Sequence, residues 1–178
     1  EHLQTSVKDL LQLRRNSLKK KPKTYTVFKE VVGAVYSYEV TYKAETGFHP
    51  HLHMIGLVPK GRFQYTEKKI KKKAVQVPEE LWSGLVNDWK EITGDSFIVD
   101  VRSVDDRDGF LSALVETFKY ALKLNDMDPE VQVECYERLK ARRLLGSLGL
   151  LFGVKLPDDL NDELLPEDLE WIDIVYQY

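Results

Sequence analysis

The stretch that decides the fold runs from Gly47 to Pro59 and reads Gly-Phe-His-Pro-His-Leu-His-Met-Ile-Gly-Leu-Val-Pro. Three of the four histidines of the chain stand in it at every second position, at the entrance to an apolar run that is typical of a buried strand. Residues two apart on a strand point to the same face, so His51 and His53 can present two imidazoles to one metal ion. We expect Pro50 to break the regular pleat between this pair and His49. The alternative is that the histidines are partly buried, hydrogen-bonded residues of the strand.

The segment just before this stretch predicts a partner strand. Residues 31–42 are rich in Val and Tyr, and their alternation places the tyrosines on one face and Glu39 on the other. Gly47 lies in the turn between the two strands, which should pair as an antiparallel hairpin. This pairing brings Glu39 near His51 and His53, where its carboxylate is either a third metal ligand or an edge charge that faces water.

Composition sets broad limits on the class of protein. The 178 residues are 43% hydrophobic and 31% charged, which indicates an ordinary globular protein of one domain, with or without an appendage. The single cysteine, Cys135, excludes an internal disulfide and fits a reducing compartment. No segment approaches the roughly 18 apolar residues that span a bilayer, and no signal peptide is visible. We therefore expect a cytoplasmic protein without membrane contact.

The charge of the chain is divided unevenly. Residues 156–178 hold eight acidic residues and no Lys or Arg, so the net charge of −3 conceals a body that carries +5. The basic residues cluster in three runs, within residues 19–23, 68–73 and 138–143. These runs favour a polyanionic partner, with nucleic acid as the first candidate. The acidic tail suggests a short helix pair or a separate regulatory flap.

The remaining periodicities predict the other elements. We expect helices over about residues 3–20, 78–94, 110–124 and 128–145, a strand over 96–104, a mobile loop or hairpin over 61–77, and an apolar segment over 144–154 that packs on the sheet. In the helix over 110–124, Val115 belongs to the predicted apolar side, and Glu116 and Tyr120 are neighbours on the polar side. Tyr120 is a surface residue or a nucleophile, and the second role requires a metal ion or an ammonium group to stabilise the phenolate.

Several sequence blocks together resemble a known family. They are Tyr38-Glu39-Val40-Thr41, Phe48-His49-Pro50-His51-Leu52-His53-Met54, Glu116-Thr117-Phe118-Lys119-Tyr120-Ala121-Leu122-Lys123, and the segment Arg142-Arg143-Leu144-Leu145-Gly146-Ser147-Leu148-Gly149. Spread over roughly residues 31–153, they resemble the initiator (Rep) proteins of rolling-circle plasmids, within the HUH endonuclease superfamily. The family usually carries a hydrophobic-Thr-Leu-Thr strand before its first helix, whereas this sequence begins at Glu1 almost directly in that helix. Either the sequence is shortened there or the edge of the sheet differs.

The resemblance implies an α+β fold, the HUH endonuclease fold, in which helices flank a central antiparallel sheet of about five strands. Residues 1–155 would form the domain that nicks DNA and binds the origin, and residues 156–178 the acidic C-terminal tail. His51, His53 and Glu39 would hold Mn²⁺ or Mg²⁺, with His49 as a possible neighbour of the ligands.

The resemblance also implies a mechanism. Tyr120 would cut one DNA strand through a 5′-phosphotyrosyl intermediate, and Glu116 would act as general base. Side chains expected to contact phosphate or DNA are Lys119, Lys123, Lys71, Lys72, Arg142 and Arg143. The expected partners are single-stranded DNA and double-stranded origin DNA, and a host helicase and polymerase are further candidates.

Three alternatives remain open at the level of the sequence. A transposase or conjugative relaxase would use the same chemistry in another setting. A non-catalytic DNA-binding module could use the histidines to hold a structural metal. A metal-dependent hydrolase of small molecules is disfavoured by the short chain and the basic body. The oligomeric state is not indicated.

Overall fold

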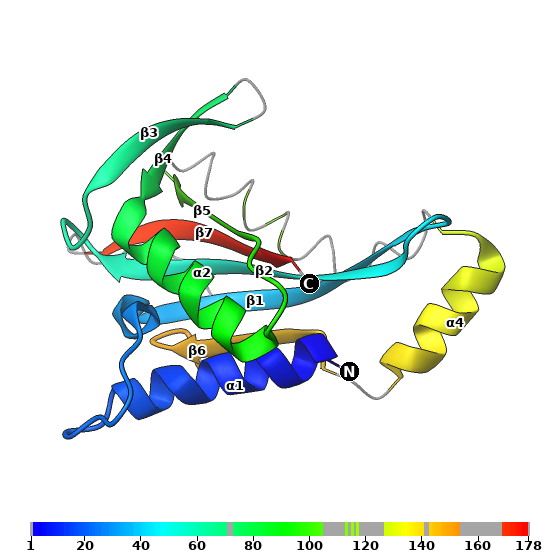
Figure 1. Cartoon of the computed structure of the whole chain (residues 1–178), viewed down its shortest axis with the longest axis horizontal. Coiled ribbons are helices and arrows are strands. Elements are labelled where there is room, and N and C mark those ends of the chain that lie inside the picture. Colours follow the sequence, from blue (N-terminus) through cyan, green and yellow to red (C-terminus); the bar gives the residue numbers. More distant parts are fainter. Residues whose placement is uncertain are drawn as a thin grey trace, which may run out of the picture.

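The computed structural model of the chain describes residues 2–70, 73–104, 113, 115, 117, 127–140, 143–153 and 169–177. The elements in chain order are α1 (His2–Ser17), the 3-10 turn η1 (Val27–Glu30), β1 (Gly33–Lys43), β2 (Gly47–Pro59), β3 (Tyr65–Ile70), β4 (Lys73–Pro78), α2 (Glu79–Thr93), β5 (Val99–Val104), α4 (Pro129–Leu139), β6 (Leu145–Gly149) and β7 (Leu169–Gln177). This is the expected α+β architecture (Figure 1). None of the helices among these residues is both long and apolar enough to cross a membrane.

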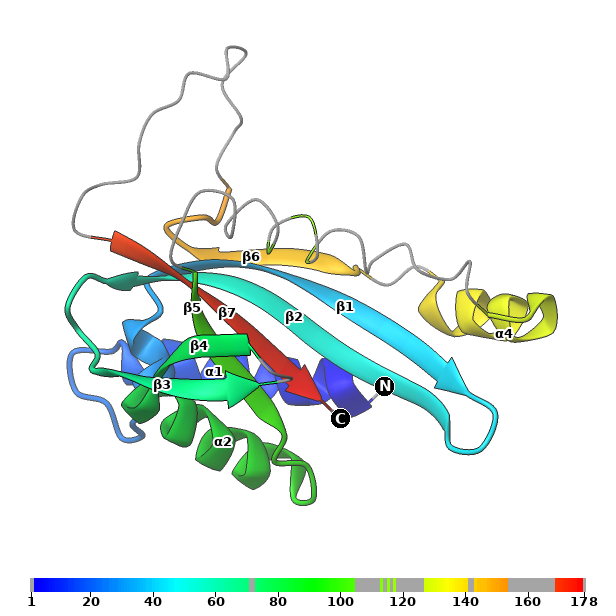
Figure 2. The ribbon, with the colours of Figure 1, turned by 90° about the horizontal axis from the view of Figure 1, so that it is seen from above.

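The strand that carries the histidines, β2, lies at the centre of a five-stranded sheet. The strand order is β5-β7-β2-β1-β6, and every neighbouring pair is antiparallel, which confirms the expected sheet. The β1–β2 hairpin is also confirmed, and Gly47 closes its turn with a φ of 80°, a conformation that glycine adopts without steric cost. Seen from above, the hairpin extends past the other strands, with α4 beside its outer part (Figure 2). A second, two-stranded sheet pairs β3 with β4 as antiparallel neighbours, as expected for a hairpin in this part of the chain.

The hydrophobic core lies between one face of the large sheet and the helices α1 and α2 (Figures 1 and 2). The helices contribute apolar side chains spaced three or four residues apart, and the strands contribute every second side chain. The fully buried residues of this core include Val7, Leu10, Leu81, Leu85, Trp89, Leu52, Met54, Val58, Ile172, Ile174 and Tyr176. The Trp89 ring packs at a tilt against the Tyr176 ring, with 4.8 Å between the ring centroids, and its Nε1 donates to the Gln177 carbonyl. Because side chains alternate along a strand, the odd-numbered residues of β2, including the three histidines, face away from this core.

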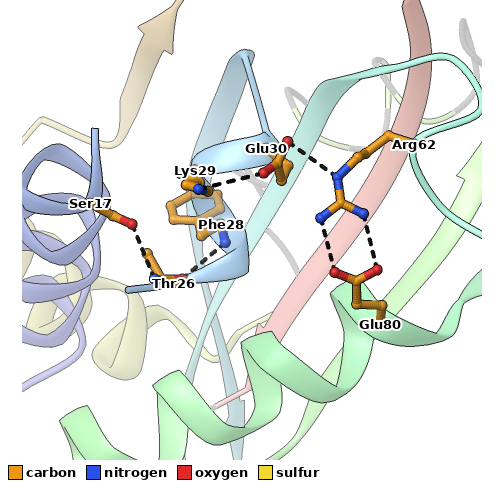
Figure 3. Close-up of polar contacts among 7 residues, drawn as sticks. All are labelled: Ser17, Thr26, Phe28, Lys29, Glu30, Arg62 and Glu80. Carbon is orange, nitrogen blue, oxygen red and sulfur yellow. Dashed lines mark hydrogen bonds and ion pairs between the residues drawn. The ribbon is translucent and has the colours of Figure 1, made fainter. Parts of the chain in front are cut away.

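Polar contacts fix α1, η1 and α2 relative to one another (Figure 3). The Thr26 backbone N–H donates to the Ser17 hydroxyl at the end of α1, and the Thr26 hydroxyl accepts from the Phe28 N–H at the start of η1. Further along, the Arg62 guanidinium donates two hydrogen bonds to the Glu80 carboxylate on α2, at 3.0 and 2.9 Å. Arg62 also lies 3.3 Å from Glu30 of η1. These contacts connect the end of α1, η1 and the start of α2 on one face of the sheet.

Two predicted elements were wrong near the C-terminal half. The helix that begins after Asp128 ends at Leu139 and does not reach residue 145, because residues 145–149 pair with β1 as the edge strand β6. The apolar segment after residue 144 thus forms part of the sheet instead of packing on it. At the other end of the chain, α1 ends at Ser17, earlier than the predicted limit, and Leu18 is exposed.

The most consequential difference concerns the acidic tail. Residues 169–177 form neither a helix pair nor a separate flap, because as β7 they lie inside the sheet between β2 and β5. Three apolar side chains of β7 at alternate positions (Ile172, Ile174 and Tyr176) are fully buried in the core. Burial of that apolar stripe, together with hydrogen bonding on both strand edges, outweighs the acidic composition of the segment.

Candidate functional site

The hairpin places the predicted histidines and Glu39 together on the sheet face that points away from α1 and α2. The cross-strand pairs on this face are Ser37 with His53, Glu39 with His51, and Thr41 with His49. Directly opposed side chains in an antiparallel pair have Cβ atoms roughly 4.5–5.5 Å apart, so these groups are immediate neighbours. The prediction that the hairpin brings Glu39 to the histidines is confirmed.

The expected break at Pro50 does not occur. Pro50 stands opposite Val40 within a continuous β2, and the pairing resumes on both sides of it without a shift. Proline lacks an N–H but its fixed φ is compatible with an extended strand, so it removes a donor without bending the pleat. His49 therefore faces the same side as His51 and His53.

Glu39 and His53 form the closest polar contact of the site. The Glu39 Oε2 atom lies 2.8 Å from His53 Nε2, and their side chains are only 7% and 16% exposed. The Ser37 hydroxyl beside them is fully buried and has no hydrogen-bond partner among the residues that the structure describes. Burying a carboxylate and a hydroxyl with so few partners is costly, so this corner of the sheet is suited to a further polar or charged ligand.

The other two histidines make different contacts. His51 Nε2 lies 3.4 Å from the Thr41 hydroxyl, and burial lowers the pKa of the His51 imidazole, an effect that the nearby Glu39 charge partly opposes. The lowered pKa favours the neutral imidazole, which is the form that binds metals. His49 Nε2 lies 2.5 Å from the hydroxyl of Thr46 in the hairpin turn, so its ring is directed toward the turn.

These side chains match a divalent ion in chemistry and partly in geometry. Two imidazoles and a carboxylate form a donor set that leaves coordination positions open. The donors of Glu39 and His53 already converge, whereas that of His51 contacts Thr41. Within the described ranges, no three His, Cys, Asp or Glu side chains are grouped as a complete metal site. A rotation of the His51 side chain toward Glu39, its cross-strand neighbour, would supply the third donor.

A charged cluster on the same face was missed by sequence reasoning. Asp173 of β7 pairs with Arg102 of β5 and with Ile55 of β2, two residues along the strand from His53. Arg102 lies 2.5 Å from Asp100 and 3.7 Å from Asp173. The alternation of Trp171, Asp173 and Val175 with buried apolar residues was the available signal, but the acidic composition around it favoured a tail.

The catalytic residues expected from the sequence, Tyr120 and Glu116, lie outside the described residues, as do Lys119 and Lys123. In that stretch the structure describes Ala113, Val115 and Thr117, all three helical, and the Thr117 hydroxyl donates to the Ala113 carbonyl. Val115 is 59% exposed whereas Thr117 is 1% exposed. The predicted apolar side of this helix was therefore wrong at Val115, since the buried side includes Thr117.

Of the expected DNA-contacting residues, Lys71, Lys72 and Arg142 also lie outside the described residues. Arg143 is described and exposed, just before β6, where it lines a groove beside α1. The lysines within residues 19–23 are exposed in the segment after α1. The structure thus places basic side chains on the surface but does not join them to the histidine site.

The fold and site define an α+β protein in which a central antiparallel hairpin carries a carboxylate and three histidines on one sheet face. The chain belongs to the Rep_1 replication protein family, whose family model matches residues 2–174. Membership of this family confirms the resemblance to rolling-circle plasmid replication initiators. Comparisons with curated proteins and with solved structures gave no significant match.

Proposed function

We propose that this replication protein is a sequence-specific single-strand DNA endonuclease and strand transferase that starts rolling-circle replication of a plasmid. Family membership supports a role in replication, and it favours this setting over a transposase or relaxase. The single observation that carries the nicking activity is the buried Glu39–His53 pair beside His51 on the central hairpin. A rigid pair of adjacent strands holds reacting groups more accurately than a loop does.

In this proposal His51, His53 and Glu39 hold Mn²⁺ or Mg²⁺. The bound ion would act as a Lewis acid toward the scissile phosphate. The three side chains would fix its position, and the buried Ser37 hydroxyl, which has no hydrogen-bond partner among the described residues, would be a further donor beside them. The site lies on the sheet face that points away from α1 and α2, so a DNA strand would approach it from the side opposite these helices.

Tyr120 is the proposed nucleophile. Its oxygen attacks the phosphorus in line, the bond to the 3′ oxygen breaks, and the products are a 5′-phosphotyrosyl bond and a free 3′-hydroxyl. Glu116 is the general base that activates water or a hydroxyl at termination, and Lys119 or Lys123 offsets charge on the phosphate. Helical spacing supports this arrangement, because Glu116 and Tyr120 are four residues apart and would be neighbours on the helix predicted over residues 110–124.

The basic runs would follow the DNA backbone. Lys71, Lys72, Arg142 and Arg143 are the proposed phosphate contacts to single-stranded and double-stranded origin DNA, which would make binding strongly salt-dependent. The free 3′-hydroxyl left by cleavage is a primer terminus, which a host polymerase would extend. A host helicase would separate the strands ahead of it.

The test is a covalent adduct. The protein is incubated with single-stranded origin DNA that carries a fluorophore at its 3′ end, in Mn²⁺, and the products are separated under denaturing conditions. We expect a labelled band at the mass of the protein plus the 3′ fragment, because the 5′-phosphotyrosyl bond survives denaturation. Tyr120→Phe should abolish it, and Tyr136→Phe, which alters an exposed tyrosine of α4, should not.

Two results would overturn the assignment. An adduct formed by Tyr120→Phe at the rate of the unaltered protein would exclude Tyr120 as the nucleophile. Retained origin binding without any adduct would instead identify a non-catalytic DNA-binding module, in which the Glu39–His53 pair has a structural role.

A further inference from the structure

A basic groove lies at the β6 edge of the sheet, apart from the histidine site. Its volume is about 650 Å³, and it lies between α1 on one side and β1 and β6 on the other. The side chains that shape it are Arg14, Arg15, Tyr36, Arg143 and Phe152. Pockets for small molecules and cofactors commonly have volumes in this range.

The positive charges of the groove have no counterions among the residues that the structure describes. Arg14 is only 8% exposed, and its guanidinium donates to the Val31 carbonyl, at 3.1 and 2.6 Å. Arg15 is bound to the neutral Gln12 side chain, at 3.3 and 2.8 Å. Among the residues that the structure describes, none of Arg14, Arg15 and Arg143 forms an ion pair with a carboxylate, and none of the residues lining the groove is acidic. A buried cation without an anion is unfavourable, so the groove is electrostatically suited to bind one.

The two exposed arginines act on the same point of the groove. Burial raises the pKa of the Tyr36 hydroxyl, and the positive charges of Arg143 and Arg15 both oppose that rise. Arg15 belongs to α1 and Arg143 to the segment before β6, and both residues line the groove together with Tyr36. Paired guanidinium groups are well matched to phosphate oxygens.

The groove also offers flat apolar surface. The Tyr36 ring lies against the backbone of Gly146 so closely that a Cβ at residue 146 would overlap it. Phe152 also lines the groove, and its side chain is 73% exposed, so the ring presents a flat surface to a ligand. Aromatic rings beside arginines provide stacking surfaces for nucleobases.

We propose that this groove is a second DNA-binding subsite that holds one nucleotide of a single strand, with its phosphate between Arg15 and Arg143 and its base stacked on Phe152. The inference rests on the proposed function as a DNA-processing protein. The groove is lined by Val35 and Ser147, which lie on the same sheet face as Glu39, and by Tyr36, which lies on the opposite face. The groove therefore lies at the β6 edge, where the two faces of the sheet meet. A strand leaving the histidine site could thus continue around the short edge strand β6.

The test measures DNA affinity as a function of salt, without metal. Binding of an oligothymidylate of about 20 nucleotides, longer than the roughly 4–16 nucleotides that one OB-fold domain covers, is followed by fluorescence anisotropy in EDTA. Removing both cations in Arg15→Gln/Arg143→Gln should lower the slope of log K against log salt concentration by about 1.4, since each contact to single-stranded DNA contributes about 0.7. Phe152→Ala should weaken binding by roughly tenfold with an unchanged slope, because stacking releases no counterions.

The matched control removes two exposed cations outside the groove, in Lys8→Gln/Lys60→Gln. An equal loss of slope in this control would overturn the proposal, because charge alone would then explain binding. Unchanged DNA binding in the arginine variant, with loss of binding to polyglutamate, would identify an acidic peptide as the ligand and also overturn it. Thermal melts would verify that the variants are folded.

The outcome is separable from that of the proposed function. The covalent adduct depends on Tyr120 and metal, whereas the anisotropy measurement uses neither. A protein without adduct formation can therefore still confirm the groove, and an active nickase can still refute it.

Discussion

Replacing Glu39 by glutamine removes the charge of the proposed metal ligand while keeping the shape of its side chain. In the metal-free protein the amide oxygen can still accept a hydrogen bond from His53 Nε2, at the place where the carboxylate lies 2.8 Å away. A hydrogen bond to a charged group contributes roughly 1.5–3 kcal/mol and a neutral one roughly 0.5–1.5 kcal/mol, so the substitution should cost about 1 kcal/mol. The substitution also removes a charge from a side chain that is only 7% exposed, and this offsets part of the cost.

The effect in the presence of Mn²⁺ should be much larger. A ligand at 100 times its Kd stabilises a folded protein by about 2.7 kcal/mol. For a chain of this length, 1 kcal/mol corresponds to roughly 2–4 °C in Tm, so Mn²⁺ should raise the Tm by about 5–11 °C. Loss of a residue that merely orients a ligand weakens metal binding by about 10–100-fold, so loss of a ligand should cost at least about 100-fold. At the same Mn²⁺ concentration Glu39→Gln would then gain only about 0.4 kcal/mol, or 1–2 °C.

The assay is thermal unfolding with and without Mn²⁺, followed by circular dichroism and supported by calorimetric titration of the metal. Glu45→Gln, in the exposed turn of the same hairpin, is the control for a change of charge near the site. It should keep the full Mn²⁺-dependent rise. A full rise in Glu39→Gln would refute Glu39 as a ligand and direct attention to His49 as the third donor.

Three further predictions concern stability. Burial raises the pKa of the Asp88 carboxyl, so the folded protein favours its protonated form and loses stability as the pH rises through that raised pKa. The Tm of Asp88→Asn should therefore increase relative to that of the unaltered protein between about pH 4 and about pH 8, and a pH-independent difference would contradict this. In urea unfolding, Gly149→Ala should lower the free energy of unfolding by at least about 1 kcal/mol more than Gly153→Ala does, and equal losses would contradict this. Both glycines have positive φ, but only at residue 149 would a Cβ overlap a backbone carbonyl, that of Val32. Leu85→Ala, at a fully buried position of α2, should cost about 2–5 kcal/mol in the same assay, and a loss below 1 kcal/mol would show that the core is not packed as described.

Local patterns allowed the central part of the site to be predicted. The alternation in residues 31–42 and 47–59, with Gly47 between them, fixes which residues share a face once the hairpin forms. Glu39 and His51 are therefore directly opposed, as expected. The helix α2 could be predicted equally well, because its apolar stripe, its acidic first turn and the capping Gly94 all lie within one short segment of sequence.

Other features depended on long-range pairing. The segment around Gly146 was expected to pack on the sheet because its glycines interrupt a strand pattern. Residues 169–177 were expected to be a tail because the acidic composition around them outweighed their alternating apolar residues. Each becomes a strand by completing hydrogen bonds that β1 or β2 leaves open on its second edge. Sequence reasoning counted the acids of the C-terminal segment and overlooked the alternate apolar residues that fill the core.

The sequence by itself determined the histidine hairpin and the position of Glu39 on it, because a two-residue period and a glycine turn act over only a few residues. Only the tertiary structure decided that β7 joins β2 at the centre of the sheet, that Asp173 and Arg102 share the histidine face, and that α1 and β6 enclose a basic groove. These features bring together segments that are distant in the chain. They depend on which apolar surfaces pack against one another, and local sequence patterns do not encode the competition among such non-local contacts.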